Sequence, residues 1–139
     1  MILAALALVA AGQHFDCRVV AVHDGDTMRC ADGTRVRLQG IDANEMDGTC
    51  HHSCAPGTAE EARQYLEVMA LGRTATCLST GRSYHRVTAW CRVDNDLGPR
   101  TDLSCAQVAS GHAVIWRRYD VHGRLKRCPK PQEPAWMLP

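Results

Sequence analysis

The chain has 139 residues, a formal net charge of +1, and a composition that is 45% hydrophobic and 22% charged. This length suits one compact domain rather than two, and the composition excludes the disordered and fibrous classes. The small net charge gives no general sign of a nucleic-acid binder. The type of basic residue is more informative: two of the sixteen are Lys, so fourteen are Arg, which grips phosphate through a bidentate fork.

The first segment, residues 1–12, is apolar and uncharged and is too short to span a bilayer. Its closing small residues predict a signal peptide cleaved after Ala11 or Gly12, although no Lys or Arg precedes the apolar run. The alternative is a buried first strand, which the scarcity of β-branched residues disfavours. We therefore expect an exported protein, periplasmic or secreted, with no membrane partner after cleavage.

Cysteine usage predicts export independently. Eight cysteines follow the apolar segment, an even number that is typical of disulfides formed in an oxidising compartment. Spacing leaves the connectivity open, but two pairings are specific hypotheses: Cys77 with Cys91, if they lie on neighbouring strands, and Cys50 with Cys54. Two histidines between Cys50 and Cys54 suggest zinc as an alternative, although structural zinc sites usually draw ligand pairs from two separated segments.

The stretch 23–45 predicts a three-stranded meander. Asp24-Gly25-Asp26 is typical of a reversal between strands, because Gly supplies unusual backbone angles and Asp tolerates them. Ala-Asp-Gly-Thr at 31–34 predicts the next turn. In residues 35–41 apolar and polar side chains alternate, which predicts one buried and one exposed face.

Arg37 belongs to the polar set of this last strand, so we expect its side chain to point away from the core. Asp42 and Glu45 follow where the strand opens into a loop, and the meander brings Asp26 towards Asp42. Carboxylates with a backbone carbonyl suit calcium, and an adjacent Arg suits phosphate. Taken one at a time, these residues also fit a turn, a solvated Arg and a cap.

Two helices and a second hairpin are expected in the rest of the chain. Residues 56–72 predict a helix that begins with a capping-box pair, Thr58 and Glu61. Residues 102–111 predict a second helix. The strands of the hairpin are predicted at 74–78 and 87–93, joined by a loop at 79–86, and residues 112–119 follow the second helix as a partly extended segment.

This order of elements predicts a β-rich α+β fold, namely a five-stranded Greek-key barrel of the OB-fold type with two packed helices. The barrel domain is assigned to residues 13–120, and a basic, Pro-rich tail to 121–139. Tyr119 is a candidate stacking residue, because an aromatic face accepts any base. An ordinary half-buried tyrosine is the alternative for this position.

The ordered motifs resemble the thermonuclease family, the staphylococcal nuclease-like proteins, over about Cys17 to Tyr119. The resemblance rests on Asp-Gly-Asp-Thr at 24–27, on the spacing Arg-x4-Asp-x2-Glu from Arg37, and on the Tyr-His-Arg at 84–86. It implies a calcium-dependent nuclease that hydrolyses phosphodiester bonds of DNA and RNA to 3′-phosphate products. Because function resides in sites rather than in folds, the site residues carry more of this expectation than the barrel does.

The resemblance also implies a role for each matching residue. These roles are calcium binding by the carboxylates of Asp26 and Asp42 and the carbonyl of Ala43, general base for Glu45, phosphate clamps for Arg37 and Arg86, and nucleotide contact for Tyr84. Two departures stand out: His85 replaces the family's Gly, although His tolerates left-handed geometry, and Asn44 replaces its Pro, which leaves Glu45 less rigidly placed. The alternative function is a catalytically silent barrel that binds single-stranded nucleic acid or an exported protein; in either case we expect a monomer.

Overall fold

The structure is a computed structural model that describes residues 9–95 and 98–128. Most of the segment predicted as a signal peptide and the end of the predicted tail, beyond Cys128, lie outside the described residues. Within the described part of the chain, no helix combines the length and the apolar character that crossing a bilayer requires.

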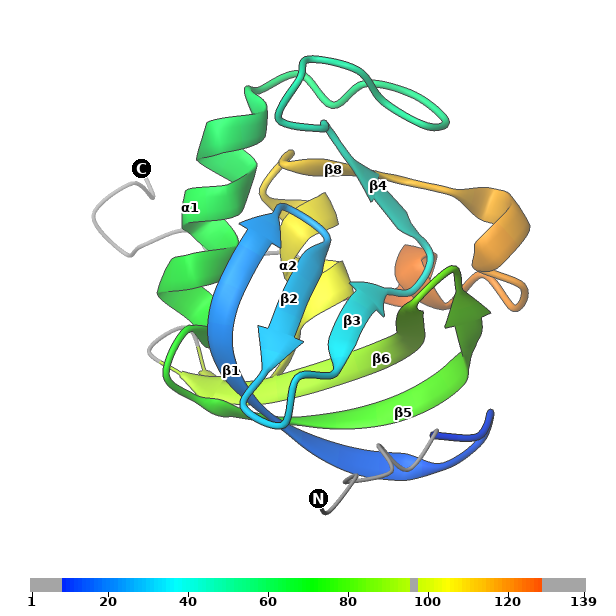
Figure 1. Cartoon of the computed structure of the whole chain (residues 1–139). Helices are drawn as coiled ribbons and strands as arrows, with labels where there is room; N and C mark the ends of the chain where they lie inside the picture. Colours follow the sequence, from blue (N-terminus) through cyan, green and yellow to red (C-terminus); the bar gives the residue numbers. More distant parts are fainter. Residues whose placement is uncertain (1–8, 96–97, 129–139) are drawn as a thin grey trace, which may run out of the picture.

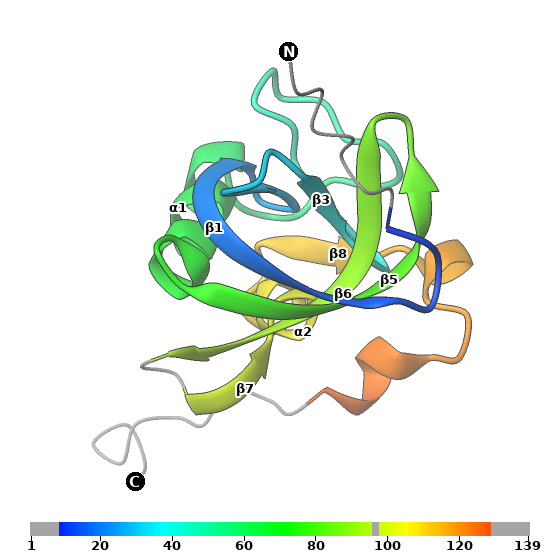
Figure 2. The same cartoon turned by 60° about the horizontal axis from the view of Figure 1, so that its bottom comes forward.

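Five strands close into a mixed β-barrel (Figure 1). They are β1 (His14–Asp24), β2 (Thr27–Cys30), β3 (Arg35–Leu38), β5 (Thr74–Ser83) and β6 (Arg86–Asn95). Neighbours in the order β3-β2-β1-β5-β6 are antiparallel, and a parallel pairing of β3 with β6 closes the barrel. β7 (Gly98–Asp102) extends the sheet beyond β6, as Figure 2 shows. The predicted OB-fold-like barrel is confirmed.

The long strand β1 pairs with two neighbouring strands along different parts of its length. Residues 14–18 pair with β5, and residues 19–24 pair with β2. A register shift between Val19 and Ala21 marks a bulge, and bulges bend strands. β1 can therefore curve around the core into which Cys17, Val19 and Val22 point.

Helix α1 (Ala59–Ala70) confirms the first predicted helix. The Thr58 side chain caps it by accepting a hydrogen bond from the Glu61 N–H at 3.1 Å. Ala62, Leu66 and Met69 recur at helical spacing and are buried against the barrel.

Helix α2 (Leu103–Ala109) confirms the second predicted helix and follows β7 directly. Its cap is Asp102, whose side chain accepts from the Cys105 N–H at 2.9 Å. The chain then forms β8 (Ala113–Ile115), which pairs antiparallel with β4 (Ile41–Ala43), and two short 3₁₀ helices, η1 (Arg117–Tyr119) and η2 (Arg124–Arg127). The β4–β8 ribbon lies where β4 leaves the barrel for the loop that carries Glu45 (Figure 1).

The β5–β6 hairpin is longer than predicted. Residues 79–83 and Arg86 continue the two strands, and a turn at Tyr84 and His85 joins them. The run of Ser, Thr and Gly at 79–83 indicates a loop by composition, but a register shift between Ser79 and Gly81 keeps the strands paired. The extended hairpin carries Arg86 at the start of β6 rather than in a loop.

Four disulfides join all eight cysteines. The bridges are Cys17–Cys30, Cys50–Cys54, Cys77–Cys91 and Cys105–Cys128. Both predicted pairings are confirmed, and Cys77 lies directly opposite Cys91 in the β5–β6 ladder. The Cys50–Cys54 bridge leaves no thiolate there to bind zinc. Such a framework is compatible with an exported protein.

Candidate active site

A buried glutamine of α2 hydrogen-bonds the backbone of the Asp24-Gly25-Asp26 turn. The Gln107 amide donates to the Gly25 carbonyl at 2.6 Å and to the Ala62 carbonyl at 3.0 Å, and Gln107 is fully buried. Within the turn, the Asp24 carboxylate accepts from the Asp26 N–H at 3.0 Å. The turn is therefore fastened to both helices, which fixes where its two carboxylates lie.

Replacing Gly25 with Ala is expected to destabilise the protein by about 1–3 kcal/mol through overpacking. A Cβ on Gly25 would lie 2.7 Å from the Cβ of Ala62 and 2.8 Å from that of Ala43, and neither backbone can move without disturbing α1 or β4. Gly57→Ala is the matched control, because its Cβ would meet a flexible side-chain atom of Glu61 at 3.4 Å. Urea unfolding of both variants checks this, and equal stabilities would contradict the packing argument.

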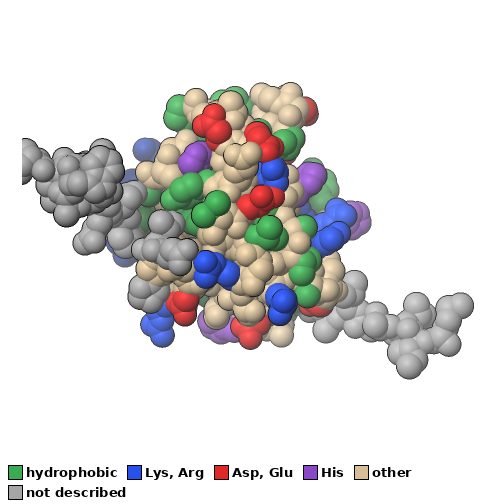
Figure 3. Space-filling view, turned by 90° about the vertical axis from the view of Figure 1, so that its left-hand side faces the viewer, with side chains coloured by type: hydrophobic (Ala, Val, Ile, Leu, Met, Phe, Trp, Pro, Cys, Tyr) green, Lys and Arg blue, Asp and Glu red, His purple; other side chains and the backbone are tan. Residues whose placement is uncertain are grey.

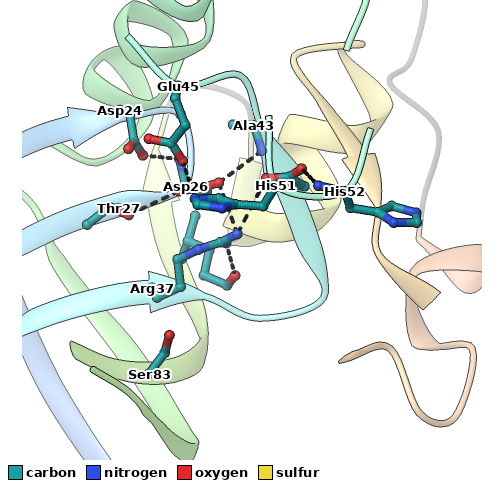
Figure 4. Close-up of polar contacts among 12 residues, drawn as sticks. Asp24, Asp26, Thr27, Arg37, Ala43, Glu45, His51, His52 and Ser83 are labelled. Atoms are coloured by element: carbon teal, nitrogen blue, oxygen red, sulfur yellow. Dashed lines mark hydrogen bonds and ion pairs between the residues drawn. The ribbon is translucent and has the colours of Figure 1, made fainter. Parts of the chain in front are cut away.

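Arg37 points away from the hydrophobic core as predicted, but the expectation that its face of the strand is exposed is wrong, because Arg37 is buried between two carboxylates. Its guanidinium lies 3.2 Å from Asp26 and 3.7 Å from Asp42, and it donates to the Leu38 carbonyl at 2.9 Å (Figure 4). Arg37 is 8% exposed, and Asp26 and Asp42 are fully buried. Val36 and Leu38 do point to the core as predicted, but alternation does not reveal that an acidic cluster covers the other face.

Burial raises the pKa of Asp26 to about 7, against the opposing pull of Arg37 and with a further rise from Asp24. Its two oxygens accept from the Thr27 hydroxyl at 3.0 Å and from the Ala43 N–H at 2.9 Å. A divalent cation bound here would favour the charged form of Asp26 and oppose its protonation.

In the metal-free protein, the stabilising contribution of Asp26 is expected to be present below about pH 4 and lost as the pH rises to about 7. The pKa is raised from 3.8 to about 7, so between these values the folded protein binds the proton more tightly than the unfolded chain does. Each rise in pH across this window therefore disfavours folding. Urea unfolding in chelator, compared with Asp26→Asn, checks this: the stability of the natural protein relative to the variant should fall with pH, and a constant difference would contradict it.

Asp24, Asp26 and Glu45 bring carboxylate oxygens within 4.8 Å of one another and form the candidate metal site. This set overlaps the predicted ligands only at Asp26. The Asp42 carboxylate turns instead to Arg37 and to the N–H groups of His52 and Ser53, at 2.7 and 3.3 Å, while its other oxygen, buried beside Arg37, has no hydrogen bond. Three hard oxygen donors suit calcium, so the donor set fits that ion.

Glu45 approaches this cluster from the loop that follows β4 (Figure 4). The loop is anchored by Asn44, whose side chain accepts from the Ala55 N–H at 2.8 Å and donates to the carbonyls of Ala55 and Gly57. Asn44 therefore anchors the loop through side-chain hydrogen bonds, whereas the Pro of the family would fix one backbone angle. His51 lies 3.0 Å from the Glu45 carboxylate, which is partly exposed.

Arg86, the second predicted phosphate clamp, lies beside the same acidic cluster. Arg86 donates to the Thr27 hydroxyl at 3.4 Å and to the Ser83 hydroxyl at 3.3 Å, and Thr27 also donates to Asp26. A groove of about 430 Å³ brings Arg37 and Arg86 together with both predicted tyrosines. Its aromatic and cationic lining residues are Arg37, His51, Arg82, Tyr84, Arg86, Trp116 and Tyr119.

The tyrosines differ in exposure. Tyr84 is 90% exposed at the hairpin tip, and its φ of 57° makes it the left-handed residue of the turn, a conformation expected at His85. Tyr119 is 42% exposed and packs edge-on against Trp116, with ring centroids 4.8 Å apart. Trp116 in turn stacks on His52, which ties η1 to the disulfide-closed loop.

Sequence reasoning missed Asp24 as a metal-site carboxylate, Gln107 as the support of the turn, and His51 as the partner of Glu45. The sequence identified Asp24 only as a residue of the Asp-Gly-Asp turn, not as a metal ligand. Gln107 gave no signal, because its partner Gly25 comes from a segment that only the fold brings near. His51 was noticed only as a possible zinc ligand, and its proximity to Glu45 depends on how the loop folds.

No protein-family model matches the sequence, and no curated protein matches it significantly.

Proposed function

We propose that this protein is a calcium-dependent nuclease of the thermonuclease type, exported and monomeric, that hydrolyses phosphodiester bonds of DNA and RNA. The observation that carries the proposal is a cluster of three carboxylates beside a groove that two arginines line. Arg37 connects the two, because it lines the groove and lies 3.2 Å from Asp26. The carboxylates suit a hard cation, the guanidinium groups suit a phosphate, and the groove is bordered by aromatic rings that accept bases.

Each residue has a distinct task in this proposal. Asp26, Asp24 and Glu45 would hold calcium, and Asp42 with the Ala43 carbonyl remains the alternative ligand pair from the resemblance. When bound, the ion supplies positive charge that neutralises the phosphate. Arg37 is fixed by its carboxylate partners, whereas Arg86 has only long hydrogen bonds to Ser83 and Thr27 and is free to bind the substrate.

Glu45 accepts a proton from a water molecule in the groove, and the water oxygen forms a bond to phosphorus. The bond from phosphorus to the 5′ oxygen breaks, and that oxygen takes a proton from solvent, which leaves a 3′-phosphate. Negative charge gathers on the equatorial phosphoryl oxygens as this happens. The guanidinium groups of Arg37 and Arg86 stabilise that charge more than they stabilise the ground state.

The deciding experiment measures cleavage of single-stranded DNA by the oxidised protein, with calcium and with chelator. Calcium-dependent cleavage to 3′-phosphate ends is the expected result. Tight binding without cleavage, in protein whose four disulfides are intact, would replace the proposal with the silent barrel. RNA of the same length, run in parallel, reports the polymer preference.

A further inference from the structure

A second groove, of about 460 Å³, adjoins the candidate active site on the other side of Arg86. It has three Arg and two His among its lining residues and no Asp or Glu. The residues that matter to the argument are His23, Arg29, Arg35, Tyr84, His85 and Arg86. Tyr84 and Arg86 line both grooves, so the two are continuous.

Arg29 and Arg35 face each other directly across the β2–β3 ladder. Like charges opposite each other destabilise a sheet, and both side chains are exposed. Within the described residues, neither guanidinium has a hydrogen bond or an ion pair. An anion bound between them would relieve the repulsion.

These two arginines continue the arrangement of the candidate active site. Arg29 follows Thr27 by two residues on β2, and Arg35 precedes Arg37 by two residues on β3, so all four belong to one face of the ladder. Two residues along a strand span about 6.8 Å. That step is comparable to the distance between neighbouring phosphates in an extended single strand.

The positive charge of this groove is local. The chain as a whole carries a net charge of +1, and the face on the α1 side shows acidic and basic side chains interspersed (Figure 3). A concentrated set of unpaired arginines beside the site therefore attracts an anion specifically to this groove.

We propose that the Arg29–Arg35 groove binds the sugar-phosphate backbone of the nucleic-acid strand beyond the phosphate that is cut. The inference rests on the proposed function for its substrate, but binding can be measured without cleavage. The groove extends the footprint on a single strand by two phosphates, one for each arginine. It gives longer substrates an advantage in KM and leaves kcat to the residues of the candidate active site.

The test measures, in chelator, the affinity for a labelled oligothymidylate of about 12 nucleotides at salt concentrations from about 50 to 200 mM. Arg29→Gln/Arg35→Gln is compared with Arg18→Gln/Lys126→Gln, which removes the same charge from exposed positions outside both grooves. The groove variant is expected to lower the log–log salt slope by about 1.4, so that its deficit is about 7-fold larger at 50 mM than at 200 mM. With calcium, its KM for the oligonucleotide should rise while kcat, and cleavage of a dinucleotide, stay unchanged.

Equal slopes in the two double variants, or a natural protein that binds anionic lipid vesicles as well as it binds DNA, would overturn the inference. Failure of the proposed function looks different: the natural protein would bind with an Arg29- and Arg35-dependent slope and yet cleave nothing. Active protein with an unchanged slope in the groove variant would reject the groove alone.

Discussion

Glu45→Gln is expected to lower kcat by about 10²–10⁴-fold, the range for loss of a general base. The substitution keeps the shape of the side chain, and the loop keeps its backbone bond from the Glu45 N–H to the Thr49 carbonyl and its Asn44 anchor. It removes the carboxylate that acts as the proposed base and that belongs to the candidate metal site. Steady-state kinetics at saturating calcium measure the effect.

Glu61→Gln is the matched control, because Glu61 is an exposed acid in the first turn of α1, away from the metal site. It should retain full activity. A calcium titration separates the two roles of Glu45: a large loss of kcat at saturating calcium assigns it as the base, whereas full recovery by added calcium would show that it acts only as a ligand. Ordinary activity in Glu45→Gln would contradict both roles.

Substitution of Arg86 and of Arg37 by Ala is expected to have similar effects on rate and different effects on stability. Arg86→Ala should lower kcat by on the order of 10²-fold, the loss expected when a donor to the transition state is removed, with little change in stability. Its hydrogen bonds to Thr27 and Ser83 are long, at 3.3–3.5 Å, and so contribute little to folding. Steady-state kinetics test the expected loss of kcat, and urea unfolding of the same preparation tests the expected stability.

Arg37→Ala should lose a similar factor in rate and also destabilise the protein at neutral pH by about 3–5 kcal/mol. It leaves Asp26 and Asp42 buried without their cation. Arg86→Lys and Arg37→Lys are the matched controls, because each keeps the positive charge and loses the bidentate guanidinium donors. Normal activity in either Ala variant would reject the phosphate clamp, and an Arg37→Ala protein of unchanged stability would contradict the buried ion-pair account.

Local signals in the sequence were sufficient for the parts of the fold that local physics decides. The predicted start of α1 is confirmed, because the Thr58 side chain accepts from the Glu61 N–H within a single turn of helix. The turn at 31–34 and the Cys77–Cys91 pairing followed from strands that are neighbours along the chain. These features require no knowledge of distant segments.

Features that depend on distant segments were not predictable. The burial of Arg37 requires β4 and the Asp24-Gly25-Asp26 turn to bring Asp42 and Asp26 against one strand face, and alternation reports only which side a residue faces. Gln107 has its partner 82 positions away. The Cys105–Cys128 bridge joins α2 to the end of η2, and spacing alone does not fix such a pairing.

The closure of the barrel bears on how heat would inactivate such a protein. β3 meets β6 through three residue pairs, whereas β5 and β6 share seven pairs and a disulfide. Arg37 and Arg86 lie on opposite sides of the shorter junction. Because proteins open locally where few contacts hold them, thermal breathing at this seam would part the two guanidinium groups while the disulfide-bonded scaffold stays folded. Heat tolerance of the proposed activity would then depend on this three-residue junction.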